Sequence, residues 1–316
     1  MPTADQHPPI DNRPDALTDD QIQAAIATLK QAGHQRVQRL GYHFQPNDYY
    51  SSCNDLAFLD ANKDLWDKSD DPLDIDWSPR RQLANAHEVG RYVEELRDVP
   101  LTADRVGQYC WKNLFWNNAD ALVQYGLVRA RQPRRVIEVG CGWSSLLLAR
   151  AVAKNESEPG SSPVQVTQIE PYPRRELLAT LPAHWKLHEC ILQRAPLDLF
   201  ATLEPGDILF YDGSHCGKAG SDVNWFFFEI LPRLNPGVLV HLHDIFLPFE
   251  YPSEWIFNDG RTWNEQYVLR AFLMNNPRYQ IEIANRYLWK HHRAEVERLY
   301  AGVQSALGCS LWMSKV

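Results

Sequence analysis

Apolar residues recur at two different spacings along this chain, and the spacing changes after residue 130. In the first part they lie three and four positions apart, which is the period of an amphipathic helix. Thr18 is a typical N-cap residue and Gly33 a typical terminator, and they flank one of these segments. Helices are therefore predicted at residues 19–32, 55–66, 80–97 and 113–130.

From residue 133 onward, short apolar runs rich in β-branched residues alternate with helical stretches. Runs that are apolar throughout favour strands covered on both faces, and the alternation is typical of a parallel sheet with crossover helices. Strands are predicted at residues 136–139, 166–169, 186–190, 208–211 and 238–243, with two later candidates at 280–284 and 310–313. The expected fold is α/β, a doubly wound Rossmann-like sheet after a helical N-terminal region.

The same pattern divides the chain into three expected regions. Residues 1–17 are rich in Pro, Asp and Asn and are expected to form a flexible arm. Residues 18–130 are expected to form a mainly helical cap region, and residues 131–316 the sheet domain.

The net charge and the cysteine spacing disfavour several classes of function. A net charge of -8 leaves no broad basic surface for nucleic acid or for anionic lipid headgroups. Because no 18-residue apolar run and no signal-peptide pattern are found, we expect a cytoplasmic protein without a membrane partner. The six cysteines form no C-x-x-C pair, which favours reduced, structural or incidental thiols over disulfides or a zinc knuckle.

Small residues follow the first predicted strand, where the chain turns into a helix at residues 146–154. Gly140 and Gly142 let the backbone approach a ligand closely, and the helix N-terminus favours an anionic ligand group. Glu170 ends the next strand, where a carboxylate can accept both hydroxyls of a ribose. The alternative is an ordinary tight turn beside a solvated strand end. Ser145 stands where a dehydrogenase would have its third glycine, which disfavours a nicotinamide cofactor.

These motifs resemble the class I S-adenosylmethionine-dependent methyltransferases, and the strings IEPYP, DGSH and HxHDIFLP resemble a largely uncharacterised bacterial branch of that family. The resemblance implies S-adenosylmethionine as the cofactor. It assigns to cofactor binding Glu138, Gly140, Cys141, Gly142, Ser144, Ser145, Glu170, Gln193 and Asp212. Within that set Glu170 would bind the ribose and Gln193 the adenine ring, although an ordinary loop glutamine remains an alternative for Gln193. Ser144 departs from the glycine that many members have, and the two serines can bond the cofactor carboxylate instead.

Two further strand ends carry the candidate catalytic residues. Asp212 ends the fourth strand and His243 with Asp244 ends the fifth, while His215 lies three residues after Asp212. The carboxyl ends of neighbouring parallel strands meet at one crevice, so these side chains are expected to converge. Catechol-type O-methyltransferases, which this region resembles, bind a metal at the equivalent of Asp212. Asp212, His243 and Asp244 are the candidate metal ligands.

The sequence leaves three interpretations of this cluster open: a bound divalent metal, metal-free chemistry with a histidine base, and a purely structural cluster. His215 is the first candidate for the base and His243 the second, because an imidazole titrates near neutral pH. His241 alternates with His243 and is expected on the same strand face, one layer deeper. Aromatic residues that could form an acceptor pocket, with core packing as the alternative, are Tyr251, Trp255, Trp263 and Tyr267.

The predicted function is methyl transfer from S-adenosylmethionine to an oxygen or nitrogen of a small molecule, in secondary metabolism. A homo-oligomer is compatible with this function. One rival is a metal-dependent hydrolase or oxygenase that uses the His241-x-His243-Asp244 cluster. Another is a non-catalytic partner subunit that keeps the cofactor fold.

Overall fold

The computed structural model describes residues 17–300 and 302–316, so the predicted arm lies outside the described residues except for Leu17. The described chain forms two compact units. Residues up to Lys68 together with Glu250–Thr262 belong to one unit, and Ser69–Phe249 with Trp263–Val316 belong to the other. The predicted domain boundary at residue 131 stays a prediction, and the larger unit contains helices from both sides of it.

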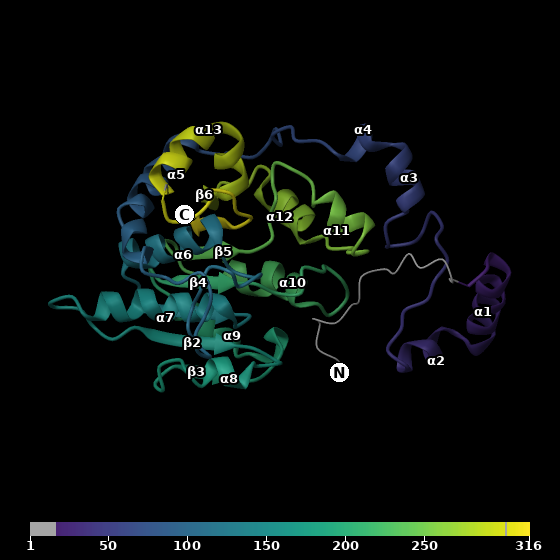
Figure 1. Ribbon diagram of the computed structural model, residues 1–316, viewed down its shortest axis with the longest axis horizontal. Coiled ribbons are helices and arrows are strands. Elements are labelled where there is room, and N and C mark those ends of the chain that lie inside the picture. The colour runs from purple at the N-terminus through teal and green to yellow at the C-terminus, as the bar shows by residue number, and fades with distance from the viewer. Residues whose placement is uncertain (1–16, 301) are drawn as a thin grey trace. The chain divides into compact units, whose positions relative to one another are not determined.

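All seven predicted strands are present in the larger unit, where they form a single sheet (Figure 1). The strands are β1 (Arg135–Val139), β2 (Gln165–Ile169), β3 (Lys186–His188), β4 (Ile208–Tyr211), β5 (Leu239–Leu242), β6 (Tyr279–Ala284) and β7 (Leu311–Lys315). Their order is β3-β2-β1-β4-β5-β7-β6, and only the pairings of β7 are antiparallel. The order reverses between β1 and β4, which in open α/β sheets marks the ligand-binding crevice at the carboxyl ends of the strands. The α/β prediction is confirmed.

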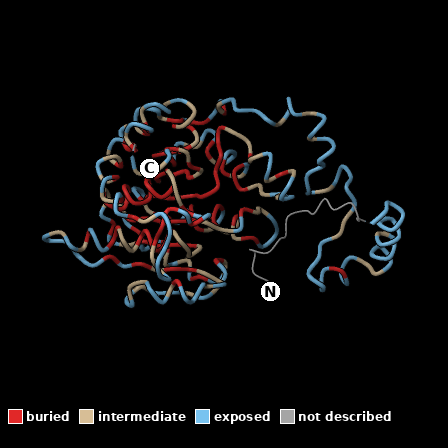
Figure 2. Tube along the Cα trace, in the orientation of Figure 1, coloured by how far each residue is buried: buried red, intermediate tan, exposed pale blue. Residues whose placement is uncertain are grey.

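Helices cover both faces of this sheet. The larger unit contains α5 (Pro79–Gly90), η1 (Val93–Leu96), α6 (Asn118–Arg131), α7 (Trp143–Glu156), α8 (Arg175–Leu178), η2 (Leu192–Arg194), α9 (Leu197–Ala201), α10 (Asp222–Trp225), η3 (Phe226–Ile230), η4 (Leu231–Arg233), α12 (Glu265–Leu273) and α13 (Asn285–Tyr300). One apolar core lies between the sheet and α5, α6 and α7, and a second lies between the opposite face and α9, η3 and α12. Figure 2 shows buried residues concentrated along the strands. This three-layer arrangement explains why the strand sequences lack an in-out alternation.

The smaller unit contains α1 (Asp19–Ala32), α2 (His34–Arg39), α3 (Leu56–Ala61), α4 (Lys63–Trp66) and α11 (Ser253–Phe257). The first predicted helix is confirmed at both ends, because the Thr18 side chain accepts from the backbone N–H of Gln21 and Gly33 ends the helix with a φ of +81°. None of the residues of α1 is buried. Among the described residues no helix is long and apolar enough to cross a bilayer.

The predicted helix at residues 113–130 is wrong at its beginning, because α6 starts only at Asn118. Asn113 is buried and holds the preceding residues in a loop instead. Its side-chain amide donates to the carbonyls of Cys110 and Trp116, and its oxygen accepts from the N–H of Trp116. An asparagine that bonds to nearby backbone in this way competes with helix formation.

Candidate active site

Gly140 is required where β1 turns into α7, the point at which the sheet order reverses. Its φ is +82°, and a Cβ atom at this position would lie 2.1 Å from the carbonyl oxygen of Asp212. The Asp212 N–H in turn donates to the carbonyl of Val139 and extends the pairing of β1 with β4. Gly142 differs, since a Cβ atom there would have nothing within 4 Å. The turn therefore packs tightly at Gly140 and leaves open space at Gly142.

Glu138 is fully buried and joins β1 to α7 and β2. Its carboxylate accepts hydrogen bonds from the hydroxyls of Ser144 and Ser145, at 2.9 and 2.8 Å, and from the Gln168 side-chain amide at 2.7 Å. Both serine hydroxyl hydrogens point to Glu138, so the predicted bonds of Ser144 and Ser145 to a cofactor carboxylate stay predictions. Burial raises the pKa of Glu138 to about 7 although these hydrogen bonds lower it.

Replacing Glu138 with glutamine is expected to stabilise the protein at pH 8 but not at pH 4. The usual pKa of this carboxyl is 4.5, so between about pH 4.5 and about pH 7 only the folded state still holds the proton. The stability of the wild-type protein relative to the variant therefore falls as the pH rises through that window, by about 3 kcal/mol in total. Urea unfolding of both proteins at several pH values measures the difference, and a pH-independent difference would contradict the assigned pKa.

Glu170 directly follows β2, and Gln193 lies in η2, the short helix after β3. One oxygen of Glu170 accepts from the Cys141 N–H at 3.0 Å and the other from the Tyr172 N–H at 2.7 Å, which leaves a further lone pair on each oxygen. The Gln193 amide donates to the Gly220 carbonyl, and its own oxygen is buried without a hydrogen-bond partner among the described residues. Both side chains thus keep acceptor capacity that no described protein group uses.

The sheet register brings the predicted catalytic residues together. Tyr211 of β4 pairs with Leu242 of β5, so Asp212 and His243 are the next residues on two adjacent parallel strands. The Asp212 carboxylate lies 3.6 Å from Nδ1 of His243 and 3.4 Å from Nε2 of His215. Asp244 lies 3.6 Å from His215 and 3.7 Å from His243. The expected convergence of Asp212, His215, His243 and Asp244 is present.

The Nδ1 atom of His215 is bound by a carboxylate that the sequence analysis did not assign. Its Nδ1 lies 2.8 Å from a carboxylate oxygen of Glu265, at the beginning of α12, and both side chains are buried. The N–H of Glu265 donates to the His215 carbonyl, and the backbone of His215 has a φ of +59°. Loop and helix therefore fix this imidazole with Nε2 facing Asp212 and Asp244.

His243 has a comparable arrangement on its other side. Its Nε2 lies 3.9 Å from a carboxylate oxygen of Asp120, in α6, and 3.7 Å from the Cys309 sulfur, which precedes β7. The Cys309 thiol also lies 3.3 Å from Asp244. A candidate metal site would combine three His, Cys, Asp or Glu side chains whose possible metal-ligand atoms all lie within 4.8 Å of one another. Among the described residues, the one such set is Asp120, His243 and Cys309. The predicted metal trio of Asp212, His243 and Asp244 shares only His243 with this set and stays a prediction.

Four carboxylates thus surround two imidazoles: Asp120, Asp212, Asp244 and Glu265 around His215 and His243. Burial lowers the pKa of each histidine, but the surrounding carboxylates outweigh it and raise both pKa values well above 6.5. For Asp212, burial alone would raise the pKa. The neighbouring His243 and His215 lower it by more, so the pKa of Asp212 lies below its usual value. Even with both imidazoles charged, the cluster carries a net negative charge.

His241 lies one layer deeper than His243, as predicted, with the ring centroids 6.1 Å apart. It is fully buried and stacks on Phe210 at 3.9 Å, and neither ring nitrogen has a side-chain hydrogen-bond partner among the described residues. Burial lowers its pKa to about 3, so the ring is neutral. His241 therefore belongs to the apolar core.

The four aromatic residues suggested for an acceptor pocket fall in different parts of the chain. Tyr251 and Trp255 belong to the smaller unit, whereas Trp263 and Tyr267 belong to the larger one. The Trp263 ring packs against the His215 ring, with centroids 4.2 Å apart. Trp263 thus contacts a predicted catalytic residue.

Sequence reasoning missed Asp120, Glu265 and Cys309. The sequence does carry a signal for Asp120. Its neighbours Ala119, Ala121 and Leu122 are apolar, which indicates a carboxylate on the buried part of a helix. Glu265 looks like an ordinary acidic residue in the first turn of a helix, and Cys309 was set aside as an incidental thiol. Neither shows in the sequence that it approaches the strand ends.

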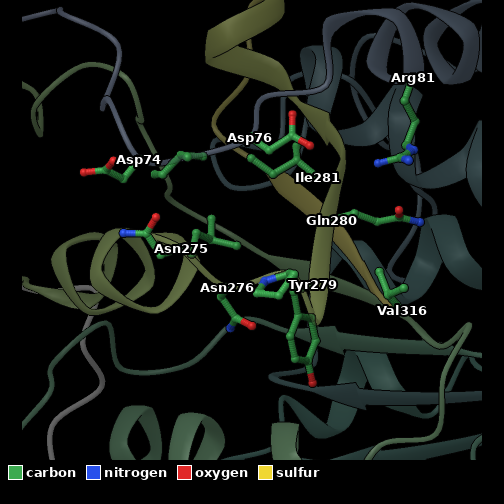
Figure 3. Close-up of a pocket in the computed structure, with 12 residues that line it drawn as sticks. Asp74, Asp76, Arg81, Asn275, Asn276, Tyr279, Gln280, Ile281 and Val316 are labelled. Atoms are coloured by element: carbon green, nitrogen blue, oxygen red, sulfur yellow. The ribbon is translucent and has the colours of Figure 1, made fainter.

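A pocket of about 500 Å³ lies elsewhere in the larger unit, between the segment at residues 74–81, the end of α12 and strand β6. Figure 3 shows Asp74 and Asn275 on one side of it and Arg81 and Val316 on the other. None of the predicted cofactor or catalytic residues lines this pocket. Its size alone assigns it no function.

Residues 137–245 match the family model described as a methyltransferase domain, which is about a third of the chain. This segment runs from β1 through the glycine turn, Glu170 and Asp212 to the residue after Asp244. A protein of Archaeoglobus fulgidus named only as uncharacterized is 27% identical over 176 residues, which cover 53% of this chain and 76% of that protein.

Two solved structures illustrate the structural likenesses. MycE methyltransferase from the mycinamycin biosynthetic pathway, in complex with Mg, SAH and mycinamycin VI, is 22% identical with a TM-score of 0.26, over 37% of this chain and 31% of that one. The chain thus matches about a third of the length of MycE. CalS11, a TDP-rhamnose 3'-O-methyltransferase of calicheamicin biosynthesis, is 14% identical with a TM-score of 0.34, over 60% of this chain and 87% of that one.

Proposed function

We propose that this chain, whose residues 137–245 match a methyltransferase-domain model, is a class I S-adenosylmethionine-dependent methyltransferase that transfers the methyl group to an oxygen or nitrogen of a small molecule. The single observation that carries the proposal is the meeting of two sites at one sheet edge. The glycine turn after β1 contacts Asp212 directly, and Asp212 contacts both candidate base residues. A cofactor bound at the turn would therefore lie beside groups that can handle an acceptor proton.

Features of the predicted cofactor residues support S-adenosylmethionine. The open space at Gly142 allows a ligand to approach the backbone closely. Glu170 keeps lone pairs for the ribose hydroxyls, and the unpartnered oxygen of Gln193 can accept from the adenine amino group. A buried acceptor without a partner costs free energy, and a ligand donor would remove that cost.

In the proposed reaction, His215 takes the proton of the acceptor through Nε2. Glu265 holds Nδ1, so the nitrogen that faces Asp212 and Asp244 is the reactive one. Asp212 and Asp244 orient the acceptor and stabilise the imidazolium that forms. Most of the acceleration would come from holding the sulfonium methyl in line with the acceptor atom. No step of this mechanism uses a metal.

The test is a methyl-transfer assay. The protein would be incubated with methyl-labelled S-adenosylmethionine and a small-molecule extract from its source organism, and products would be identified by mass spectrometry. A labelled small molecule that is absent without protein and absent with the His215→Asn variant is the expected result. Label that appears equally with both proteins, or only in macromolecules, would overturn the proposal.

A further inference from the structure

We propose that Asp120, His243 and Cys309 bind a zinc ion on the side of His243 that faces away from Asp212. The three residues come from three different elements: the first turn of α6, the end of β5 and the segment before β7. Asp120 and His243 are buried and Cys309 is half-buried. The site shares His243 with the predicted catalytic residues and borders Asp244, but zinc binding there does not depend on methyl transfer.

The donor atoms are spaced as ligands of one ion. Nε2 of His243 lies 3.9 Å from the Asp120 oxygen and 3.7 Å from the Cys309 sulfur, and that sulfur and oxygen are 3.6 Å apart. Zinc–ligand bonds of about 2.0–2.3 Å in a tetrahedral arrangement place ligand atoms roughly 3.3–3.6 Å apart. The observed triangle is only slightly larger.

The hydrogen bonds within this triangle are long and involve the Cys309 thiol, which is a weak hydrogen-bonding group. An N–H donor of imidazole reaches a carboxylate oxygen at about 2.7–3.2 Å, so the 3.9 Å contact of His243 with Asp120 is not a hydrogen bond. The hydrogen bond that Nε2 does make is with the Cys309 sulfur, at 3.7 Å, and a thiol is a weak hydrogen-bonding group. The other oxygen of Asp120 is the one that accepts from the N–H and hydroxyl of Ser310 and from the Asn285 amide. Those bonds fix the carboxylate in place.

The chemistry of the donor set favours zinc. A thiolate, an imidazole and a carboxylate are all common zinc ligands, whereas magnesium and calcium prefer oxygen donors. The Cys309 thiol would lose its proton to solvent as the ion binds, since thiolate is the ligand form. A carboxylate oxygen of Asp244, 3.3 Å from the sulfur, is next to the set and is the nearest candidate for a fourth ligand. The positive ion would also offset the net negative charge of the cluster.

Metal content tests the proposal. The purified full-length protein would be dialysed against zinc ions alone and its bound zinc measured by plasma mass spectrometry. We expect one zinc ion per chain in the wild-type protein. Cys309→Ser is expected to weaken zinc binding by a factor of 100 or more, since even loss of an outer partner costs roughly 10–100-fold. Cys53→Ser, which removes an exposed cysteine, and Asp212→Asn are expected to retain the zinc.

Cobalt substitution gives a second readout. The cobalt-loaded wild-type protein is expected to show a thiolate-to-metal charge-transfer band that is missing in Cys309→Ser and present in Cys53→Ser. Because Asp120 also anchors the backbone at Ser310, Asp120→Asn is interpreted only if its thermal unfolding stays cooperative. A wild-type protein that binds no zinc would overturn the proposal. Zinc kept by Cys309→Ser but lost by Asp212→Asn would also overturn it, because the ion would then lie on the other side of His243.

Discussion

Replacing His215 with asparagine is expected to lower the rate of methyl transfer by roughly 10²–10⁴-fold, the usual contribution of a general base. Its Nε2 faces Asp212 and Asp244, while Glu265 occupies Nδ1, so Nε2 is the nitrogen proposed to take the proton. Affinity for S-adenosylmethionine is expected to stay nearly unchanged, because the glycine turn, Glu170 and Gln193 remain. Single-turnover rates and cofactor calorimetry on the same preparations separate the two quantities.

The matched control is His184→Asn, since His184 is an exposed histidine outside the cluster. This variant is expected to retain the wild-type rate. The pH profile gives a second check. The carboxylates around His215 raise its pKa well above 6.5. The neutral form that can take a proton is therefore populated only at higher pH, so the rate is expected to keep increasing as the pH rises above 6.5 towards the raised pKa. A His215→Asn variant with full activity would contradict the base assignment.

Replacing Gly140 with alanine is expected to lower the free energy of unfolding by about 3 kcal/mol or more. The φ of +82° strains any side chain, and the new Cβ atom would lie 2.1 Å from the carbonyl oxygen of Asp212. Since that carbonyl belongs to the backbone at the end of β4, the contact can be relieved only by separating β4 from the turn. Urea unfolding measures the loss.

Gly142→Ala is the control for this effect. Its φ is -170°, which any residue adopts, and a Cβ atom there meets nothing within 4 Å. Stability is therefore expected to stay close to that of the wild type, while S-adenosylmethionine binding weakens because the methyl group occupies the space proposed for the cofactor. Equal stability of Gly140→Ala and Gly142→Ala would contradict the assigned packing of the turn.

The strands could be predicted from the sequence because each is a short apolar run between turn residues. Burial on both faces of the sheet makes this signal strong, and all seven strands were found to within two residues at each end. The helix at residues 113–130 was placed too early, since the spacing of its apolar residues does not reveal that Asn113 bonds to the backbone. Hydrogen bonds from the Asn113 side chain to the backbone, which compete with helix formation, can be recognised only in the three-dimensional structure.

The candidate site was predicted in part for a related reason. Asp212, His243 and Asp244 follow strands, and the geometry of a parallel sheet places them together whatever the rest of the chain does. Asp120 and Glu265 approach from helices and Cys309 from the segment before β7, so their positions depend on how α6, α12 and β7 pack. Sequence spacing carries no information on that packing. Glu265, which contacts His215, and Asp120, which contacts His243, could therefore be identified only in the structure.

Calorimetric titration of S-adenosylmethionine into the purified protein tests the central claim most directly. We expect one saturable site per chain in the wild-type protein and much weaker binding to Glu170→Ala, which removes the acceptor proposed for the ribose hydroxyls. Thermal unfolding of both proteins checks that the variant is folded. Failure of the folded wild-type protein to bind, or equal binding by Glu170→Ala, would contradict the assignment of the cofactor site.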